Sequence, residues 1–175
     1  ADVLLGNYNP AGRLPITFPL HEGQLPLVSN HKPTGRGDDY NNLSGYPQFP
    51  FGYGLSYTSF EYSNIFFSKN NIKTTDTATV SITVKNSGKK DGDEVVQLYI
   101  KDLLSSVTRP VMELKGFERI HLKAGESKRI QFSITPELLT MLNANLQPVI
   151  EAGQFRIMIG ASSSDIRLQE ILTVQ

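Results

Sequence analysis

The feature that most restricts the fold of this chain is an alternation of apolar and polar residues with a period of two. In residues 79–85, Val80, Ile82 and Val84 alternate with polar neighbours. Because successive side chains of a β-strand point to opposite faces, such a run predicts a strand with one buried face. The same alternation returns three more times, at Val96, Leu98 and Ile100, at Ile130, Phe132 and Ile134, and at Phe155, Ile157 and Ile159.

Glycine-containing clusters that suit tight turns separate these runs. They lie at 86–88, 91–92, 124–125 and 152–153. Three further runs flank the four strands, at 60–68, 111–122 and 166–174. The total of about seven short strands, with turns between them, predicts an antiparallel β-sandwich.

One short helix is expected within 135–143. Thr135 can cap its N-terminus, and Pro136 then occupies the first helical position, where its missing N–H costs nothing. We expect one or two turns at most.

Charge and composition exclude several classes of partner and site. The 175 residues carry 17 basic and 17 acidic side chains, so the formal net charge is zero and favours neither nucleic acid nor an anionic membrane. The absence of cysteine excludes disulfides, cysteine-type zinc sites and a thiol nucleophile. No apolar stretch is long enough for a membrane span, and residues 1–20 lack the pattern of a signal peptide.

The first 56 residues follow a different pattern. Seven of the ten prolines lie in the first 55 residues. Residues 1–5 followed by Gly6 resemble the last turn of a helix with a glycine cap. Leu14, Ile16 and Phe18 alternate as in a strand, but Pro15 limits that strand to the edge of a sheet.

From residue 19 to residue 54 neither the helical nor the strand period is sustained, and so long an irregular stretch is unusual within a compact domain. We therefore expect residues 1–56 to lie on a neighbouring surface, and the chain to be the C-terminal piece of something larger. The expected division is 1–20 as the end of another domain, 21–56 as a linking and docking segment, and 57–175 as the sandwich.

Aromatic residues are concentrated between residues 40 and 67, which hold ten of the sixteen in the chain. Large rings bury much area at a small entropic cost, so this cluster favours contact between domains. Sugar stacking is the alternative, but the chain has no tryptophan. We expect Gly52 and Gly54 to permit a tight backbone path between the rings rather than to cradle a phosphate. The residues predicted to dock are Phe49, Phe51, Tyr53, Tyr57 and Phe60.

No catalytic group and no metal site is predicted. Glycosidases of most families need two carboxylates that face each other across the scissile bond. The acidic pairs here, Asp38–Asp39 and Asp93–Glu94, are neighbours in sequence and have no tuning His or Lys beside them, so they are not expected to converge. Asp93 and Glu94 are expected to flank a hairpin turn. The histidines, His21, His31 and His121, are expected to be ordinary surface residues without a metal.

Four motifs in order along the chain resemble one known family. They are GNYNPAGRLP from Gly6 with TFP from Thr17, FPFGYGLSYTSFEYS from Phe49, GDEVVQLYI from Gly92, and RPVMELKGF from Arg109. Together they resemble the C-terminal region of glycoside hydrolase family 3, of the β-glucosidase and β-xylosidase type. The resemblance implies a TIM-like barrel and an α/β sandwich upstream. It implies a fibronectin type III/immunoglobulin-like sandwich over 57–175, preceded by the irregular segment, and both catalytic carboxylates upstream of this stretch.

The resemblance implies that the chain is the accessory C-terminal region that supports the catalytic domains of a retaining exo-β-glycosidase. The activity that it favours for the parent is that of a β-glucosidase. The partners of the chain would be the catalytic barrel and α/β domains and the β-linked saccharide substrate of the parent, which would be periplasmic or secreted. No cofactor is expected. Arg36, Asp39 and Tyr40 could reach a substrate subsite, but only in the full parent. The alternative is a self-standing carbohydrate-binding or adhesive sandwich with no catalytic role.

Overall fold

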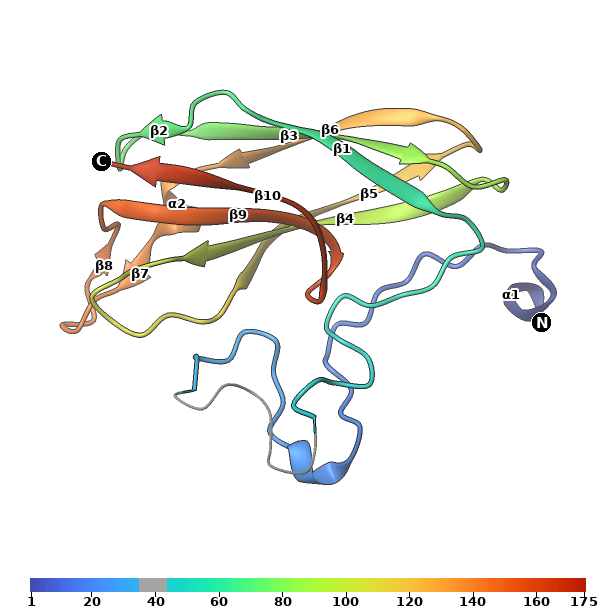
Figure 1. The fold of residues 1–175 in the computed structure, drawn as a ribbon, viewed down its shortest axis with the longest axis horizontal. Coiled ribbons are helices and arrows are strands. Elements are labelled where there is room, and N and C mark those ends of the chain that lie inside the picture. Colours follow the sequence, from blue (N-terminus) through green and yellow to red (C-terminus); the bar gives the residue numbers. More distant parts are fainter. Residues whose placement is uncertain (35–43) are drawn as a thin grey trace.

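The computed structural model describes residues 1–34 and 44–175 and contains a β-sandwich with an arm beneath it (Figure 1). Seven long strands form the sandwich: β1 (Phe60–Phe67), β3 (Ala78–Asn86), β4 (Gly92–Asp102), β5 (Glu113–Leu122), β6 (Ser127–Ile134), β9 (Gly153–Ser162) and β10 (Asp165–Val174). Each overlaps one of the seven predicted runs. Three strands of two residues were not predicted: β2 (Asn71–Ile72), β7 (Met141–Leu142) and β8 (Pro148–Val149).

The long strands are divided between two sheets. One sheet has the order β1-β3-β6 and the other the order β2-β10-β9-β4-β5, while β7 and β8 form a separate small hairpin. All pairs of long strands are antiparallel. The short pair of β2 with β10 is parallel. The predicted sandwich of the fibronectin type III-like class is therefore confirmed, with one short parallel pair at an edge.

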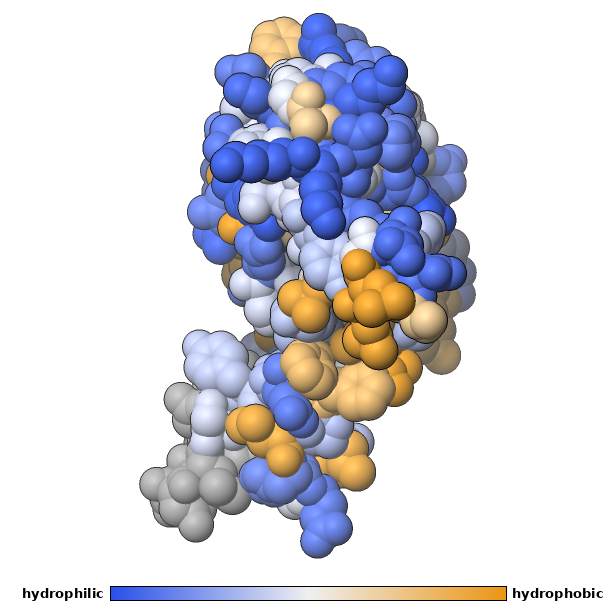
Figure 2. Space-filling model, turned by 90° about the vertical axis from the view of Figure 1, so that its right-hand side faces the viewer, coloured by the Kyte–Doolittle hydropathy of each residue, from blue (hydrophilic) through white to orange (hydrophobic). Residues whose placement is uncertain are grey.

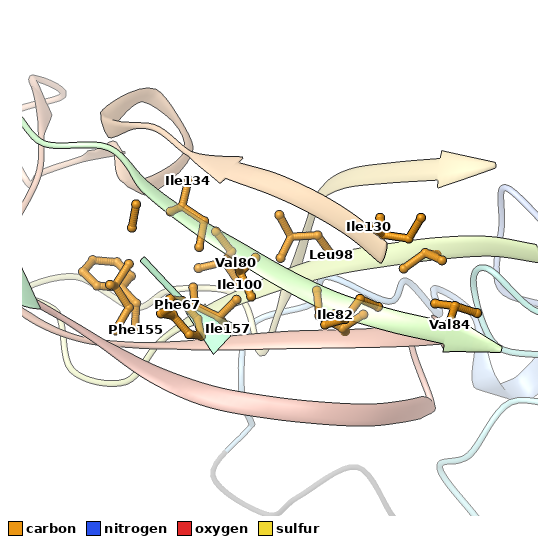
Figure 3. Packing of buried hydrophobic residues seen from close by; sticks show 14 of the residues in the cluster. Phe67, Val80, Ile82, Val84, Leu98, Ile100, Ile130, Ile134, Phe155 and Ile157 are labelled. Carbon is orange, nitrogen blue, oxygen red and sulfur yellow. The ribbon is translucent and has the colours of Figure 1, made fainter. Parts of the chain in front are cut away.

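The core lies between the two sheets and is built by the alternating residues (Figure 3). Val80, Ile82 and Val84 on β3 meet Leu98 and Ile100 on β4, and all five are buried. The period of two thus sorts side chains directly into core and surface.

Both predicted helices are single turns. Helix α2 (Pro136–Leu139) follows Thr135 and has proline at its start, as expected, but it is shorter than 135–143 because β7 begins at Met141. Helix α1 (Asp2–Leu5) ends at Gly6, whose φ of 76° is the left-handed conformation that glycine adopts without strain.

We call residues 7–34 and 44–59 the arm. It contains one short 3-10 turn, η1 (Glu22–Gln24), and otherwise follows an irregular path away from the sandwich (Figure 1). The predicted edge strand at 14–18 does not form. An isolated bridge joins Phe18 to Phe49, and Leu14 exchanges backbone hydrogen bonds with Gly52 and Tyr53. The prolines at 15 and 19 lack the N–H donors that a continuous ladder needs.

A shortened chain of residues 57–175 should fold. Every buried residue of the central core lies at Phe60 or beyond, so removing residues 1–56 takes away none of it. The sandwich loses its contacts with the arm, and we expect the same circular dichroism spectrum with a lower urea midpoint. A shortened chain without a cooperative transition would show that the division at residue 57 is wrong.

Candidate domain-docking site

Two segments of the arm run side by side and pack their rings together. Phe18 meets Phe49 edge to face, with ring centroids 6.3 Å apart, and Phe49 meets Tyr53 at 5.1 Å with a tilt of 31°. Pairs of this kind add modest stability beyond the area they bury. The rings therefore hold residues 14–18 against 48–53, but they do not form a core comparable with that of the sandwich.

Gly52 lies at a close contact between the arm and the sandwich. Its φ is 79°, and a Cβ at this position would overlap the side-chain amide of Gln97. A Cβ on Gly54 would overlap the backbone oxygen of Gly12. Both glycines therefore permit a tight backbone path, as predicted, but the close neighbours are an amide and a backbone carbonyl rather than rings.

Gln97 fixes this contact from β4. The residue is buried, and its Nε2 donates to the carbonyls of Gly52 at 3.1 Å and Ala161 at 2.6 Å. Its Oε1 accepts the hydroxyl of Tyr99 at 2.5 Å, and burial raises the pKa of that tyrosine. A buried amide with its donors and acceptor satisfied holds one geometry, because any shift would leave a polar group unpaired.

Asn9 joins three segments at the start of the arm. Its Nδ2 donates to the carbonyl of Asp91 at 2.9 Å. Its Oδ1 accepts from the Ser56 hydroxyl at 3.0 Å and from the Tyr57 backbone N–H at 2.8 Å. Tyr57 in turn donates its hydroxyl to the carbonyl of Val3 at 2.5 Å, which ties α1 to the same place.

Arg13 and Glu94 form a buried ion pair between the arm and the sandwich. The Arg13 Nη2 lies 2.5 Å from Glu94 Oε1, and the two side chains are 11% and 3% exposed. Glu94 is the third residue of β4 and follows the connection from β3, but that connection joins strands of different sheets and is not the predicted hairpin turn. Glu94 has the same parity as Val96 and Leu98 and therefore faces inward. An acidic residue that alternates with core residues along a strand indicates that the acid is buried and paired with a cation. The sequence analysis did not recognise this signal at Glu94.

The pair lines a cleft of about 320 Å³ at one end of the sandwich. Both sheets contribute to it, since Phe60 comes from β1 and Ser162 and Arg167 come from β9 and β10. The arm closes one side with residues 53–56.

Asp93 also differs from its prediction, because it lies in β4 and pairs across to β5. Its carboxylate is 2.5 Å from Arg119 and 2.6 Å from His121. Burial acts to raise the Asp93 pKa, but hydrogen bonds from these two side chains outweigh it and lower that pKa below its usual value. His121 is thus not an isolated surface histidine. The two acids use opposite faces of one strand, so they do not converge on a common atom.

The predicted docking residues have different environments. Phe49, Phe51 and Tyr53 are half-buried within the arm, and Tyr57 is 45% exposed. Phe60 is 8% exposed and belongs to the core of the sandwich, where its ring is not available to a second surface. The other candidates, Arg36, Asp39 and Tyr40, lie outside the described residues.

Exposed apolar side chains gather at α1 and along the arm. Figure 2 shows them around the narrow junction and below it, while the sandwich above presents mainly polar side chains. Of the seventeen large apolar residues exposed in the described part of the chain, twelve lie in the first 57 residues: Val3, Leu4, Leu5, Tyr8, Ile16, Phe18, Leu20, Leu25, Val28, Tyr46, Leu55 and Tyr57. A contiguous surface of this kind is typical of a site that another surface covers.

Two further kinds of site are missing from residues 1–34 and 44–175. No group of three or more His, Cys, Asp or Glu side chains there is arranged to hold a metal ion. None of the helices in these residues has the length and apolar character needed to cross a membrane.

Comparison with known families decides the identity of this chain. Residues 1–57 match the glycosyl hydrolase family 3 C-terminal domain, and residues 94–163 match the fibronectin type III-like domain. The chain belongs to glycoside hydrolase family 3. The first match ends within the arm, and the second begins within β4 and ends just after β9.

Relatives of this family 3 chain match it almost from end to end. A putative β-xylosidase of Formosa agariphila is 44% identical over 95% of this chain, and the periplasmic β-glucosidase of Salmonella typhimurium is 41% identical over 95%. Solved β-glucosidases of Erythrobacter marinus and Listeria innocua, the latter in complex with glucose, superpose with TM-scores of 0.94 and 0.92 at 38% and 36% identity, over 100% and 99% of this chain. The chain spans only 22% to 25% of the length of these four proteins.

Gly52→Ala should weaken the attachment of the arm more than the backbone conformation alone explains. Gly125 has nearly the same φ of 80°, but a Cβ there would meet no atom within 4 Å, so Gly125→Ala is a matched control. We expect Gly125→Ala to lower the free energy of unfolding by about 1 kcal/mol through left-handed strain. Gly52→Ala should cost clearly more, because Gln97 must also move. Equal losses in urea unfolding would contradict the proposed contact.

Arg13→Met should destabilise the chain by leaving Glu94 without its cation. Removing one partner of a buried pair is costly, and because the cleft lets water approach Glu94 we expect a loss of about 2–3 kcal/mol. Arg119→Met is the control, since Arg119 is 58% exposed in its pair with Asp93 and should cost less than about 1 kcal/mol. Urea unfolding of both variants measures the difference, and a loss of similar size in each would refute the assigned role of Arg13.

Proposed function

We propose that this chain is the non-catalytic C-terminal part of a retaining exo-acting β-glycosidase. β-Glucosidase activity on terminal non-reducing β-D-glucosyl residues is the first choice for the whole protein. The support is that relatives named β-glucosidases and β-xylosidases contain a region like this one as about a quarter of their length. The chain alone is proposed to be inactive, with both catalytic carboxylates on upstream domains.

The role of this part is to dock onto the catalytic domains and support them. The observation that carries this proposal is the row of exposed apolar side chains on α1 and the arm, next to a sandwich whose own core is complete. The polar contacts of Asn9, Arg13 and Gln97 hold the arm to the sandwich, which leaves its apolar side chains for a second surface. The proposed partners are therefore the barrel and α/β domains of the same enzyme.

Two narrower proposals accompany this role. The segment with Arg36, Asp39 and Tyr40 contributes to a substrate subsite of the whole enzyme, where a cation, an acid and a ring that are close in sequence suit sugar hydroxyls and faces. The enzyme acts in the periplasm or outside the cell, which agrees with the name of the Salmonella typhimurium relative.

Charged substitutions on the exposed arm should disturb the whole enzyme but not this chain. Ile16→Asp and Leu20→Asp replace side chains that are 57% and 53% exposed. In the 175-residue chain they should leave the urea midpoint unchanged. In the whole enzyme they place a charge in a buried interface, so we expect a Tm lower by at least about 4 °C and reduced turnover of an aryl β-glucoside.

Leu142→Asp is the matched control, because Leu142 is 56% exposed and lies on β7, outside the arm. It should leave the urea midpoint of the 175-residue chain and the Tm and turnover of the whole enzyme unchanged.

The 175-residue chain itself should hydrolyse no aryl β-glucoside. Turnover by the purified chain that is lost on Asp38→Asn or Asp39→Asn would overturn the proposal, as would a whole enzyme that tolerates Ile16→Asp and Leu20→Asp.

A further inference from the structure

The cleft beside the Arg13–Glu94 pair contains an acceptor that the described chain does not satisfy. Oε1 of Glu94 receives both the Arg13 Nη2 at 2.5 Å and the Val95 backbone N–H at 2.7 Å. Oε2 receives no hydrogen bond from residues 1–34 or 44–175. Glu94 is only 2% exposed and lines the cleft, so the remaining oxygen of this carboxylate is available to a guest there. Because the cleft lets water approach Glu94, a hydroxyl group of a guest can take the place of water as the donor to this oxygen.

A donor without a partner lies near this acceptor. The Tyr62 hydroxyl is buried and makes no hydrogen bond within the described residues. Burial and the nearby charge of Glu94 both raise the Tyr62 pKa, so this phenol stays protonated and able to donate. Tyr62 does not line the cleft and its hydroxyl is closed off from solvent, so the group that a guest can reach is the free acceptor Glu94 Oε2.

Each cation of the cleft is paired with a carboxylate. Arg167 donates to the Asp165 carboxylate and to the Phe60 carbonyl, and its guanidinium lies 4.8 Å from the centre of the Tyr62 ring. Arg13 donates to Glu94 and to backbone carbonyls at 11 and 12. Two guanidinium groups and two carboxylates, those of Glu94 and Asp165, line the cleft, so a guest with a net charge of either sign would meet like charges. The charges of the cleft therefore favour a neutral guest.

Hydroxyl groups complete the lining. Ser56, Thr58, Ser59 and Ser162 all contribute to it. The Ser56 and Thr58 hydroxyls already donate to Asn9 and Asn86 and can only accept from a guest, whereas those of Ser59 and Ser162 can also donate. The volume of about 320 Å³ is at the lower end of the range for ligand pockets, which suits one sugar ring better than a chain.

We propose that this cleft binds a single neutral sugar ring, such as glucose or xylose, through a ring hydroxyl that donates to Glu94 Oε2. The site is separate from the docking role proposed above, because it lies within this chain and needs no catalytic domain. Sugar binding here would bring the arm and both sheets together around one ligand.

The test is a titration of the 15N-labelled 175-residue chain with D-glucose and D-xylose, followed by NMR. We expect saturable shifts of backbone amides in 53–59 and 161–167 with a millimolar Kd. Ser59→Trp fills the cleft from an exposed position and should weaken binding by at least about tenfold. Ser133→Trp, at an exposed serine on β6 outside the cleft, should leave the affinity unchanged.

Leu55→Trp replaces a second lining residue, 67% exposed, and should weaken binding as well if Ser59→Trp disturbs the fold. The absence of saturable shifts up to ~100 mM sugar would mean that the cleft holds only water, and would overturn the proposal. Sugar shifts that persist in both tryptophan variants would overturn it too, as would saturable binding of inorganic phosphate at these amides in place of sugar. Since no catalytic domain is present, failure here leaves the docking proposal untouched.

Discussion

The contact between Arg13 and Glu94 is the interaction on which the arrangement of this chain depends. It joins residues that are 81 positions apart and places a cation of the arm at the end of the sandwich interior. A buried acid of this kind is tolerated only with a partner, because an unpaired charge away from water is strongly unfavourable. In the complete chain Glu94 on β4 is therefore paired with the arm, and Arg13 fixes where the arm begins to cross the sandwich.

The arm and the sandwich differ in how they are stabilised. The sandwich buries a continuous apolar cluster between its sheets, as an independent domain does. The arm is held by directional contacts such as those of Asn9 and Gln97, which set position more than they add stability, since each hydrogen bond replaces one made to water. Its apolar side chains therefore remain largely on the surface. This difference is the physical basis for assigning support to the sandwich and docking to the arm.

The sequence by itself determined the sandwich. Strand position follows from the alternation around Val80, Leu98 and Ile157, because the period of a strand is a local property and burial acts on it directly. The turn at Gly6 and the helix start at Thr135 were predictable for the same reason, as each depends on a few adjacent residues.

Only the tertiary structure decided which polar residues meet across the junction. The partners of Glu94, Gln97 and Asp93 come from distant parts of the chain, and no local pattern encodes such pairs. The tertiary structure also places Phe60, one of the residues predicted to dock, in the core of the sandwich. Phe60 is the first residue of β1, and its side chain faces inward. Local periodicity specifies which face of a strand is buried, whereas the choice of partner requires the whole chain to be folded.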